Sequence, residues 1–124
     1  QMTCQELITA STENIPLKIV VFNNGNHGMV RQWQKIFYDH RFSASELTHH
    51  TPDYVALAEA MGAVGLRMVE KSDVNRVFEE MFKINDRPVL VDCVVDPDDM
   101  VFPMVPAGGS NDVVLLNEDD LKNI

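Results

Sequence analysis

The sequence has few cysteines, few basic residues and no long apolar run, and each shortage excludes a class of protein. Two cysteines, Cys4 and Cys93, stand far apart among 124 residues. They are too few for a disulfide-stapled fold and predict reduced thiols in a cytoplasmic protein. Ten basic against 19 acidic residues give a net charge of −9, which argues against nucleic acid or an anionic membrane as a partner. No apolar run reaches the roughly 18 residues that a transmembrane helix needs.

The negative charge is confined to one part of the chain. The first 50 residues contain four acidic and four basic side chains, so the whole net charge of −9 comes from residues 51–124. Charged residues keep a surface in contact with water. The neutral, aromatic-rich first part is therefore expected to face something other than bulk solvent.

Short apolar runs alternate with amphipathic stretches as far as residue 95. Runs rich in β-branched residues predict buried strands at 17–22, 64–69 and 88–95. The apolar spacing predicts helices at 3–13, 29–37, 51–61 and from residue 72 to about 82. Thr51 and Ser72 are the expected helix caps, and Gly62 is the expected helix end. Strands that alternate with helices predict a three-layer α/β/α fold with a mostly parallel sheet.

The end of the chain has a different composition. Residues 98–124 show no regular period and contain two prolines, two adjacent glycines and an acidic end. We therefore divide the chain into a domain at 1–97 and a tail at 98–124. Because the chain opens on a helix, whereas parallel α/β units open on a strand, we expect a domain that lacks its first strand.

The segment Asn-Asn-Gly-Asn-His-Gly at 23–28 is the strongest candidate for chemistry. It follows a predicted strand, and ligands of open parallel sheets bind at the carboxyl ends of strands. Amide and carbonyl oxygens can bind Mg²⁺, and glycine lets the backbone approach a diphosphate. Composition alone favours the plainer alternative, a strand-to-helix loop built from turn-forming residues.

Two motifs connect this sequence to a known family. Asn23-Asn24 after an apolar strand resembles the end of the thiamine-diphosphate motif, which begins with Gly-Asp-Gly. The string Gly-Met-Val-Arg-Gln-Trp-Gln at 28–34 and the string Phe-Pro-Met-Val-Pro at 102–106 are much rarer. Together they resemble the catalytic (large) subunit of acetolactate synthase, also called acetohydroxyacid synthase, over essentially the whole chain.

The resemblance implies a site for thiamine diphosphate and Mg²⁺. Its metal ligands would be the side chain of Asn24 and the carbonyl of Asn26, together with the aspartate of Gly-Asp-Gly, which would lie upstream of this chain. The cofactor's neighbours would be Met2, Asn24, Gly25, Asn26, His27, Gly28 and Met29. Core filling is the structural alternative for both methionines. Without the aspartate, we expect this chain to bind the metal and the cofactor poorly on its own.

The resemblance also implies a channel to the active site. Its lining would include Met29, Val30 and Trp33, with Ala107 and Gly108 contributed by a tail that folds over it. Met29 and Trp33 stand four residues apart, which places them on one face of a helix. An interface or core anchor is the alternative for a single tryptophan. His49-His50 has no third ligand at suitable spacing, so we do not expect a metal there.

The family reaction joins two pyruvates into 2-acetolactate, or pyruvate and 2-oxobutyrate into 2-aceto-2-hydroxybutyrate, in branched-chain amino-acid biosynthesis. The resemblance implies a homodimer or tetramer, a possible regulatory small subunit, and FAD held mainly outside this chain. The catalytic glutamate of the family belongs to another domain on a partner subunit. No catalytic residue is therefore assigned here, and the chain alone is expected to be inactive.

Two other functions are compatible with these residues. One is another thiamine-diphosphate enzyme acting on 2-oxo acids, such as an oxidase, a decarboxylase or a glyoxylate carboligase. The rare strings around Trp33 and in the tail argue against it. The other is a non-catalytic α/β interaction domain that kept the fold and lost its cofactor. Absence of Gly-Asp-Gly upstream of this chain would favour the second.

Overall fold

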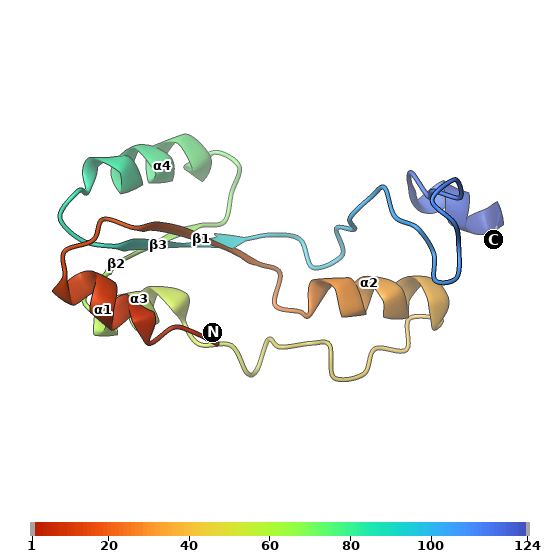
Figure 1. Ribbon diagram of the computed structural model, residues 1–124, viewed down its shortest axis with the longest axis horizontal. Coiled ribbons are helices and arrows are strands. Elements are labelled where there is room, and N and C mark those ends of the chain that lie inside the picture. The colour runs from red at the N-terminus through yellow and green to blue at the C-terminus, as the bar shows by residue number, and fades with distance from the viewer. Residues whose placement is uncertain (1, 124) are drawn as a thin grey trace. The chain divides into compact units, whose positions relative to one another are not determined.

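A computed structural model describes residues 2–123, and side chains as far as residue 120. In chain order the elements shown in Figure 1 are α1 (Glu6–Thr12), β1 (Lys18–Asn23), α2 (Gly28–Phe37), α3 (Tyr54–Ala60), β2 (Val64–Met68), α4 (Asp73–Lys83), β3 (Val89–Val94) and the 3-10 helix η1 (Glu118–Asn123). The predicted strands and helices are confirmed, although α1 and α3 are shorter at both ends than the helices predicted at 3–13 and 51–61. Among the described residues, no helix is long and apolar enough to cross a membrane.

The chain folds into two compact units. Unit 1 contains the chain up to Asn24 and the segment Thr48–Asp96, and unit 2 contains Gly25–Leu47 and the chain from Pro97 onward. Unit 2 therefore joins α2 and its following loop to the C-terminal segment. The division into a cofactor-binding domain at 1–97 and a tail at 98–124 stays a prediction.

A three-stranded parallel sheet forms the centre of unit 1. The strand order is β1-β3-β2, and β3 pairs in parallel with both neighbours. Helix α4 covers one face of this sheet, while α1 and α3 cover the other (Figure 1). The central strand is the most apolar and the most buried, because both faces and both edges of it are covered. The predicted parallel α/β fold is confirmed.

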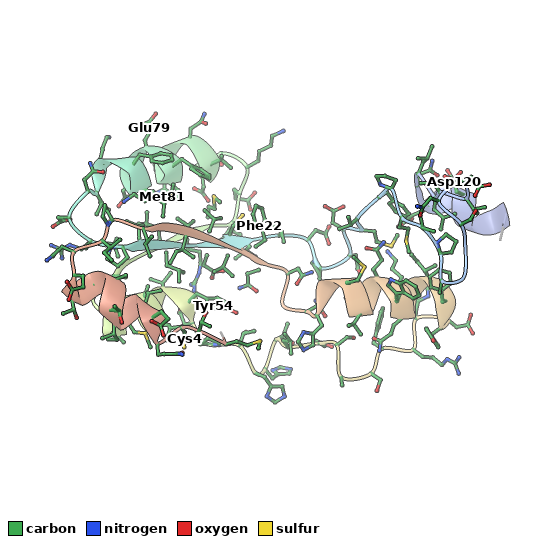
Figure 2. All side chains as sticks on the ribbon, viewed as in Figure 1. Cys4, Phe22, Tyr54, Glu79, Met81 and Asp120 are labelled. Carbon is green, nitrogen blue, oxygen red and sulfur yellow. The ribbon has the colours of Figure 1, made fainter. Side chains whose placement is uncertain are left out.

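Each face of the sheet has its own apolar core. Under α4 the buried residues are Met68, Val77, Met81, Val89 and Val91, and Figure 2 shows Met81 between α4 and the sheet. Under α1 and α3 they are Leu7, Ala58, Ala63 and Leu90. Alternate residues of β3 thus serve opposite cores, as the period of two in a strand requires.

Polar contacts join α2 to the C-terminal segment within unit 2. Gln32 is buried, and its side chain donates to the carbonyl of Val101 at 3.0 Å and accepts from the N–H of Val101 at 2.9 Å. Arg31 forms an ion pair with Asp98 at 2.9 Å. The segment after residue 97 was predicted to have no regular structure, yet it contains η1 and a two-residue bridge between Met104 and Leu115.

One predicted helix cap, Thr51, was wrong, and the other, Ser72, has the predicted position at the start of α4 but not the hydrogen bond. The cap of α3 is Asp53 rather than Thr51, and its carboxylate accepts from the N–H groups of Val55 and Ala56. Ser72 precedes α4 but its hydroxyl makes no capping bond. The carboxylate of Asp73 accepts instead from two backbone N–H groups just before the helix. A carboxylate satisfies exposed N–H groups more strongly than a hydroxyl because it carries charge.

Candidate functional site

The end of β1 presents the Asn-Asn pair. Asn23 is the last residue of the strand, and its carbonyl accepts from the N–H of Val95 at 3.0 Å. Its side-chain Nδ2 donates to Oδ1 of Asp92 at 2.9 Å. Asn24 follows outside the strand and is half-buried. The strand stops here because the next residue, Gly25, has a φ of 66°, in the left-handed region that glycine adopts without strain.

A buried aspartate next to this strand end was missed by the sequence analysis. Asp92 lies in β3 with 2% of its surface exposed. An isolated carboxylate in that position would be strongly unfavourable, so it must be paired and hydrogen-bonded. Its partners are Asn23 on β1 and Arg67 on β2, whose Nε donates to Oδ2 at 3.0 Å. A single acidic residue inside the apolar run at 88–95 was the signal that could have found it.

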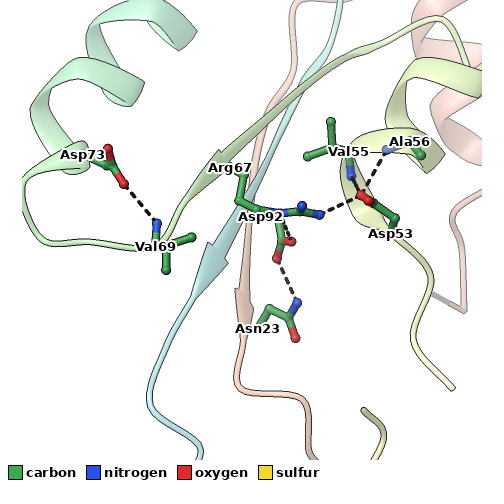
Figure 3. A network of polar contacts seen from close by, with 8 residues as sticks. All are labelled: Asn23, Asp53, Val55, Ala56, Arg67, Val69, Asp73 and Asp92. Atoms are coloured by element: carbon green, nitrogen blue, oxygen red, sulfur yellow. Dashed lines mark hydrogen bonds and ion pairs between the residues drawn. The ribbon is translucent and has the colours of Figure 1, made fainter. Parts of the chain in front are cut away.

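Arg67 extends the network to the cap of α3, as Figure 3 shows. One of its terminal nitrogens donates to Oδ1 of Asp53 at 2.7 Å. The hydrogen bond to Asp92, followed by the charge and hydrogen bond of Asp53, raises the pKa of Arg67. The pKa of Asp53 is lowered, first by the hydrogen bond from the N–H of Ala56 and then by Val55 and Arg67. The side chains of Asn23, Asp92, Arg67 and Asp53 thus form one chain of contacts.

The loop before α2 is anchored within unit 2 through its backbone. The N–H of His27 donates to the carbonyl of Ser45, and the N–H of Leu47 donates to the carbonyl of Gly25, both at 2.8 Å. Asn26 forms a two-residue bridge with Glu46. His27 is exposed at its side chain. Main-chain pairing with residues 45–47 therefore holds the loop that is predicted to approach a diphosphate.

An open hollow in unit 2 brings together three of the predicted channel residues. Met29, Val30 and Trp33 line it along one face of α2, and its volume is about 930 Å³. The rest of its lining is Gln34, Tyr38, Arg41 and Ser43. Met29 and Val30 are about half exposed, at 56% and 49%. The predicted shared face of Met29 and Trp33 is confirmed, and core filling does not describe Met29 in this structure.

The other predicted residues lie elsewhere in their units. Ala107 and Gly108 are exposed and are not among the residues that line this hollow. Gly108 has a φ of 79° at a turn. Met2, in unit 1, is 96% exposed and fills no core there. The assignment of these residues to a cofactor or a channel stays a prediction.

The predicted metal ligands are oxygen donors without charge. Within the described residues, no group of three or more His, Cys, Asp or Glu side chains could hold a metal ion. The amide oxygen of Asn24 and the carbonyl of Asn26 are hard donors of the kind that Mg²⁺ accepts. Such donors fit Mg²⁺ only together with negatively charged ligands, because neither of them balances the charge of the ion.

A family model and the sequences of known proteins both relate this chain to thiamine diphosphate-dependent enzymes. Residues 1–93 match the family described as "Thiamine pyrophosphate enzyme, C-terminal TPP binding domain". An acetolactate synthase of Mycobacterium bovis is 51% identical over 117 residues, which are 92% of this chain and 19% of that protein. The acetolactate synthase large subunit of Corynebacterium glutamicum is 47% identical over 114 residues, 90% of this chain and 18% of that protein. The predicted resemblance is confirmed, and the chain spans about a fifth of the length of these relatives.

A solved structure shows the same fold. It is a thiamine diphosphate-dependent 4-hydroxybenzoylformate decarboxylase from Rhodococcus jostii, with a TM-score of 0.65 and 26% sequence identity. The match covers 76% of this chain and 17% of that one. The parallel sheet and its helices are therefore an arrangement that occurs in a cofactor-dependent enzyme.

Proposed function

Because the chain belongs to the thiamine pyrophosphate enzyme family, as its C-terminal TPP binding domain, we propose that it is the cofactor-binding part of an acetolactate synthase large subunit. The observation that carries this proposal is the 47–51% identity to acetolactate synthases over 90% or more of the chain. The complete enzyme would join two molecules of pyruvate, or pyruvate and 2-oxobutyrate, for branched-chain amino-acid synthesis. It would hold FAD mainly outside this chain and act in the cytoplasm as a homo-oligomer, with a regulatory subunit where one is present.

The role of this domain in the proposed reaction is to hold the diphosphate end of the cofactor. Asn24 through its side chain and Asn26 through its carbonyl would bind Mg²⁺, which would neutralise charge on the diphosphate. The backbone of Gly25, His27 and Gly28 would lie beside it. The bound thiamine diphosphate supplies the electron sink for decarboxylation of a 2-oxo acid, while the protein supplies position and electrostatics.

The hollow along α2 supports a role in substrate approach. Its walls combine an indole, a thioether and a branched aliphatic side chain from Trp33, Met29 and Val30. Small 2-oxo acids have an apolar alkyl end and an anionic end. The apolar wall suits the first, and Arg41, which also lines the hollow, suits the second.

The first experiment measures the products made by the complete polypeptide that contains this chain. With pyruvate, thiamine diphosphate and Mg²⁺, we expect 2-acetolactate, detected as acetoin after acid decarboxylation. The chain of 124 residues alone should give no turnover. Acetaldehyde as the main product would instead favour a decarboxylase, the activity named for the Rhodococcus structure, and acetyl phosphate would favour an oxidase.

A pair of asparagine variants tests the metal assignment in the same polypeptide. Asn24→Ala removes the proposed ligand and should raise the Mg²⁺ concentration for half-maximal activity by roughly 10- to 100-fold. Asn75→Ala is the control, because Asn75 lies exposed on α4. Equal metal requirements for both variants would contradict the assignment of Asn24.

A further inference from the structure

Burying the carboxylate of Asp92 costs hydration free energy, and packing of the sheet does not require a carboxylate at this position. A carboxylate with 2% exposure in the central strand loses most of its hydration. An apolar residue of similar size at this position would avoid that loss, since buried ion pairs are commonly no more stabilising than apolar packing. The neighbours of Asp92 along β3 are Val91 and Cys93, so this strand accepts apolar residues. Any role of the carboxylate beyond packing therefore depends on its hydrogen-bond partners.

The register of the sheet places those partners on one face. Asp92 stands opposite Arg67 on β2 and opposite Val21 on β1. Asn23 is two residues after Val21, so its side chain emerges on the same face, one step closer to the carboxyl end of the sheet. Figure 3 shows Asp92 between Asn23 and Arg67. The carboxylate accepts from one donor on each flanking strand, through a different oxygen for each.

Asn23 is thereby fixed at two points. Its carbonyl accepts from the N–H of Val95, and its side chain donates to Asp92. With both the carbonyl and the side chain held, the peptide plane that joins Asn23 to Asn24 has little freedom to rotate. Asp92 is itself held by Arg67, which the cap residue Asp53 holds in turn.

We propose that Asp92 is a positioning residue: through Asn23 it fixes the direction in which Asn24 leaves β1 toward the metal and diphosphate. This inference rests on the proposed function, because the proposed function makes Asn24 a ligand of Mg²⁺. Arg67 and Asp53 complete the network, because Arg67, itself held by Asp53, keeps the carboxylate of Asp92 in a buried position where it has lost its hydration. None of these three residues touches the cofactor or the reacting atoms in this proposal.

The test uses Asp92→Asn in the complete polypeptide. A carboxylate accepts two hydrogen bonds from two donors, whereas a carboxamide offers one acceptor oxygen and one N–H₂ group. The variant therefore cannot accept from Asn23 and Arg67 through separate oxygens: the contact with Asn23 is lost, or is kept only as a hydrogen bond between neutral groups after the Asn23 amide has turned over. We expect a roughly tenfold weaker affinity for Mg²⁺ in calorimetric titrations with thiamine diphosphate, and little change in kcat once both are saturating.

A second substitution tests whether the contact itself matters. In Asp92→Asn combined with Asn23→Asp, the new amide can donate to the new carboxylate while its oxygen still accepts from Arg67. The double variant should recover most of the lost affinity, whereas Asn23→Asp alone places two carboxylates together and should lose it. Such a double-mutant cycle isolates the pairwise contribution. Failure of the double variant to exceed both single variants would overturn the proposal.

A control and an independent readout separate positioning from stability. Asp73→Asn removes a carboxylate that also bonds backbone N–H groups and an arginine, but on the α4 side of the fold. It should leave the Mg²⁺ affinity unchanged. In the protein without cofactor, hydrogen exchange at residues 23–25 should be faster in Asp92→Asn than in the unmodified protein.

Each outcome has a distinct meaning. A lower melting temperature of Asp92→Asn with unchanged exchange at 23–25 and unchanged Mg²⁺ affinity would show a purely structural role. If Asp92→Asn does not fold, Asn23→Ala breaks the same bond from the other side and must show the same loss of affinity. If the unmodified polypeptide binds no thiamine diphosphate, the proposed function fails, while the exchange measurement still decides the positioning role.

Discussion

Replacing Gly65 by alanine tests how closely α3 packs on β2. An ideal Cβ at residue 65 would lie 2.6 Å from the carbonyl oxygen of Val55, 2.8 Å from its Cα and 2.9 Å from its Cγ1. Two of these atoms belong to the backbone, so a change of side-chain rotamer cannot relieve the clash. The first turn of α3 would have to retreat by roughly 0.8 Å for the oxygen to reach the ordinary contact distance of 3.4 Å.

The expected loss of stability is the difference between two effects. Forcing an extra methyl group into a filled space costs about 1–3 kcal/mol. Alanine also restricts the unfolded chain more than glycine, which stabilises the folded state by about 0.4–1 kcal/mol. The clash with backbone places the first effect at the upper part of its range, so we expect a net destabilisation of about 1–2 kcal/mol.

Urea unfolding followed by far-ultraviolet circular dichroism measures this difference. The midpoint should fall in Gly65→Ala while the slope with urea stays the same, because the surface exposed on unfolding is almost unchanged. Equal or greater stability would refute the reasoning, since it would mean that α3 and β2 are not in close contact at this residue.

The same substitution has a consequence for the network around Asp92. Val55 is two residues after Asp53, so a displaced first turn moves the carboxylate that lies 2.7 Å from Arg67. In the complete polypeptide, Gly65→Ala should therefore weaken Mg²⁺-dependent cofactor binding more than Met81→Ala does, although the latter is the more destabilising change. Met81 packs under α4, on the opposite face of the sheet. Equal effects on binding would contradict the relay through Asp53.

Three further predictions concern single residues. Met81→Ala should lower the free energy of unfolding by about 2–5 kcal/mol in the same urea experiment, because it leaves a cavity in the core. The control is Val69→Ala, at a side chain that is 57% exposed, which should change the free energy of unfolding by less than about 0.5 kcal/mol. Hydrogen bonds, first from Arg76 and then from two backbone N–H groups, lower the pKa of Asp73 to about 2. The charged carboxylate therefore stabilises the fold above its usual pKa of 3.8, and this stabilisation is lost as the pH falls toward 2. The difference in the free energy of unfolding between the unmodified protein and Asp73→Asn should shrink over that range. In Gly108→Ala the added Cβ meets no atom within 4 Å, but alanine must adopt a φ of 79°. The substitution should therefore destabilise unit 2 by about 1–2 kcal/mol. Urea unfolding followed by the fluorescence of the single tryptophan measures this loss, and an unchanged unfolding midpoint would exclude backbone strain at residue 108.

Local sequence patterns were sufficient to predict the elements of the fold. The β-branched run at 17–22 and the apolar spacing at 74–82 depend on contacts between near neighbours, which the sequence displays directly. The caps were less certain because Thr51 and Asp53 are both good capping residues two positions apart. Only the path of the backbone decides which one faces the exposed N–H groups of α3.

The site was predictable only where the chain itself brings residues together. Met29 and Trp33 share a face because helical spacing places them there, and the sequence predicted it. Asp92 and Asn23 are 69 positions apart and meet only through the register of β1 with β3. A buried carboxylate can be suspected from an acidic residue in an apolar run, but its partners cannot be named before the strand order is known.

The alternation that builds the core also accounts for the position of the polar network. On the face toward α3, Ile19 and Leu90 stand side by side in an apolar layer with Gly65. Two residues further toward the carboxyl ends, this face has polar side chains on β3 and β2, namely Asp92 and Arg67. On β1 the first polar side chain of this face comes two residues later, at Asn23, because Val21 is the residue opposite Asp92. The face toward α4 makes no such change, because its corresponding positions on the central strand are Val91 and Cys93. Since parallel strands share one carboxyl edge, the change on a single face gathers the polar groups at the edge where such sheets bind ligands.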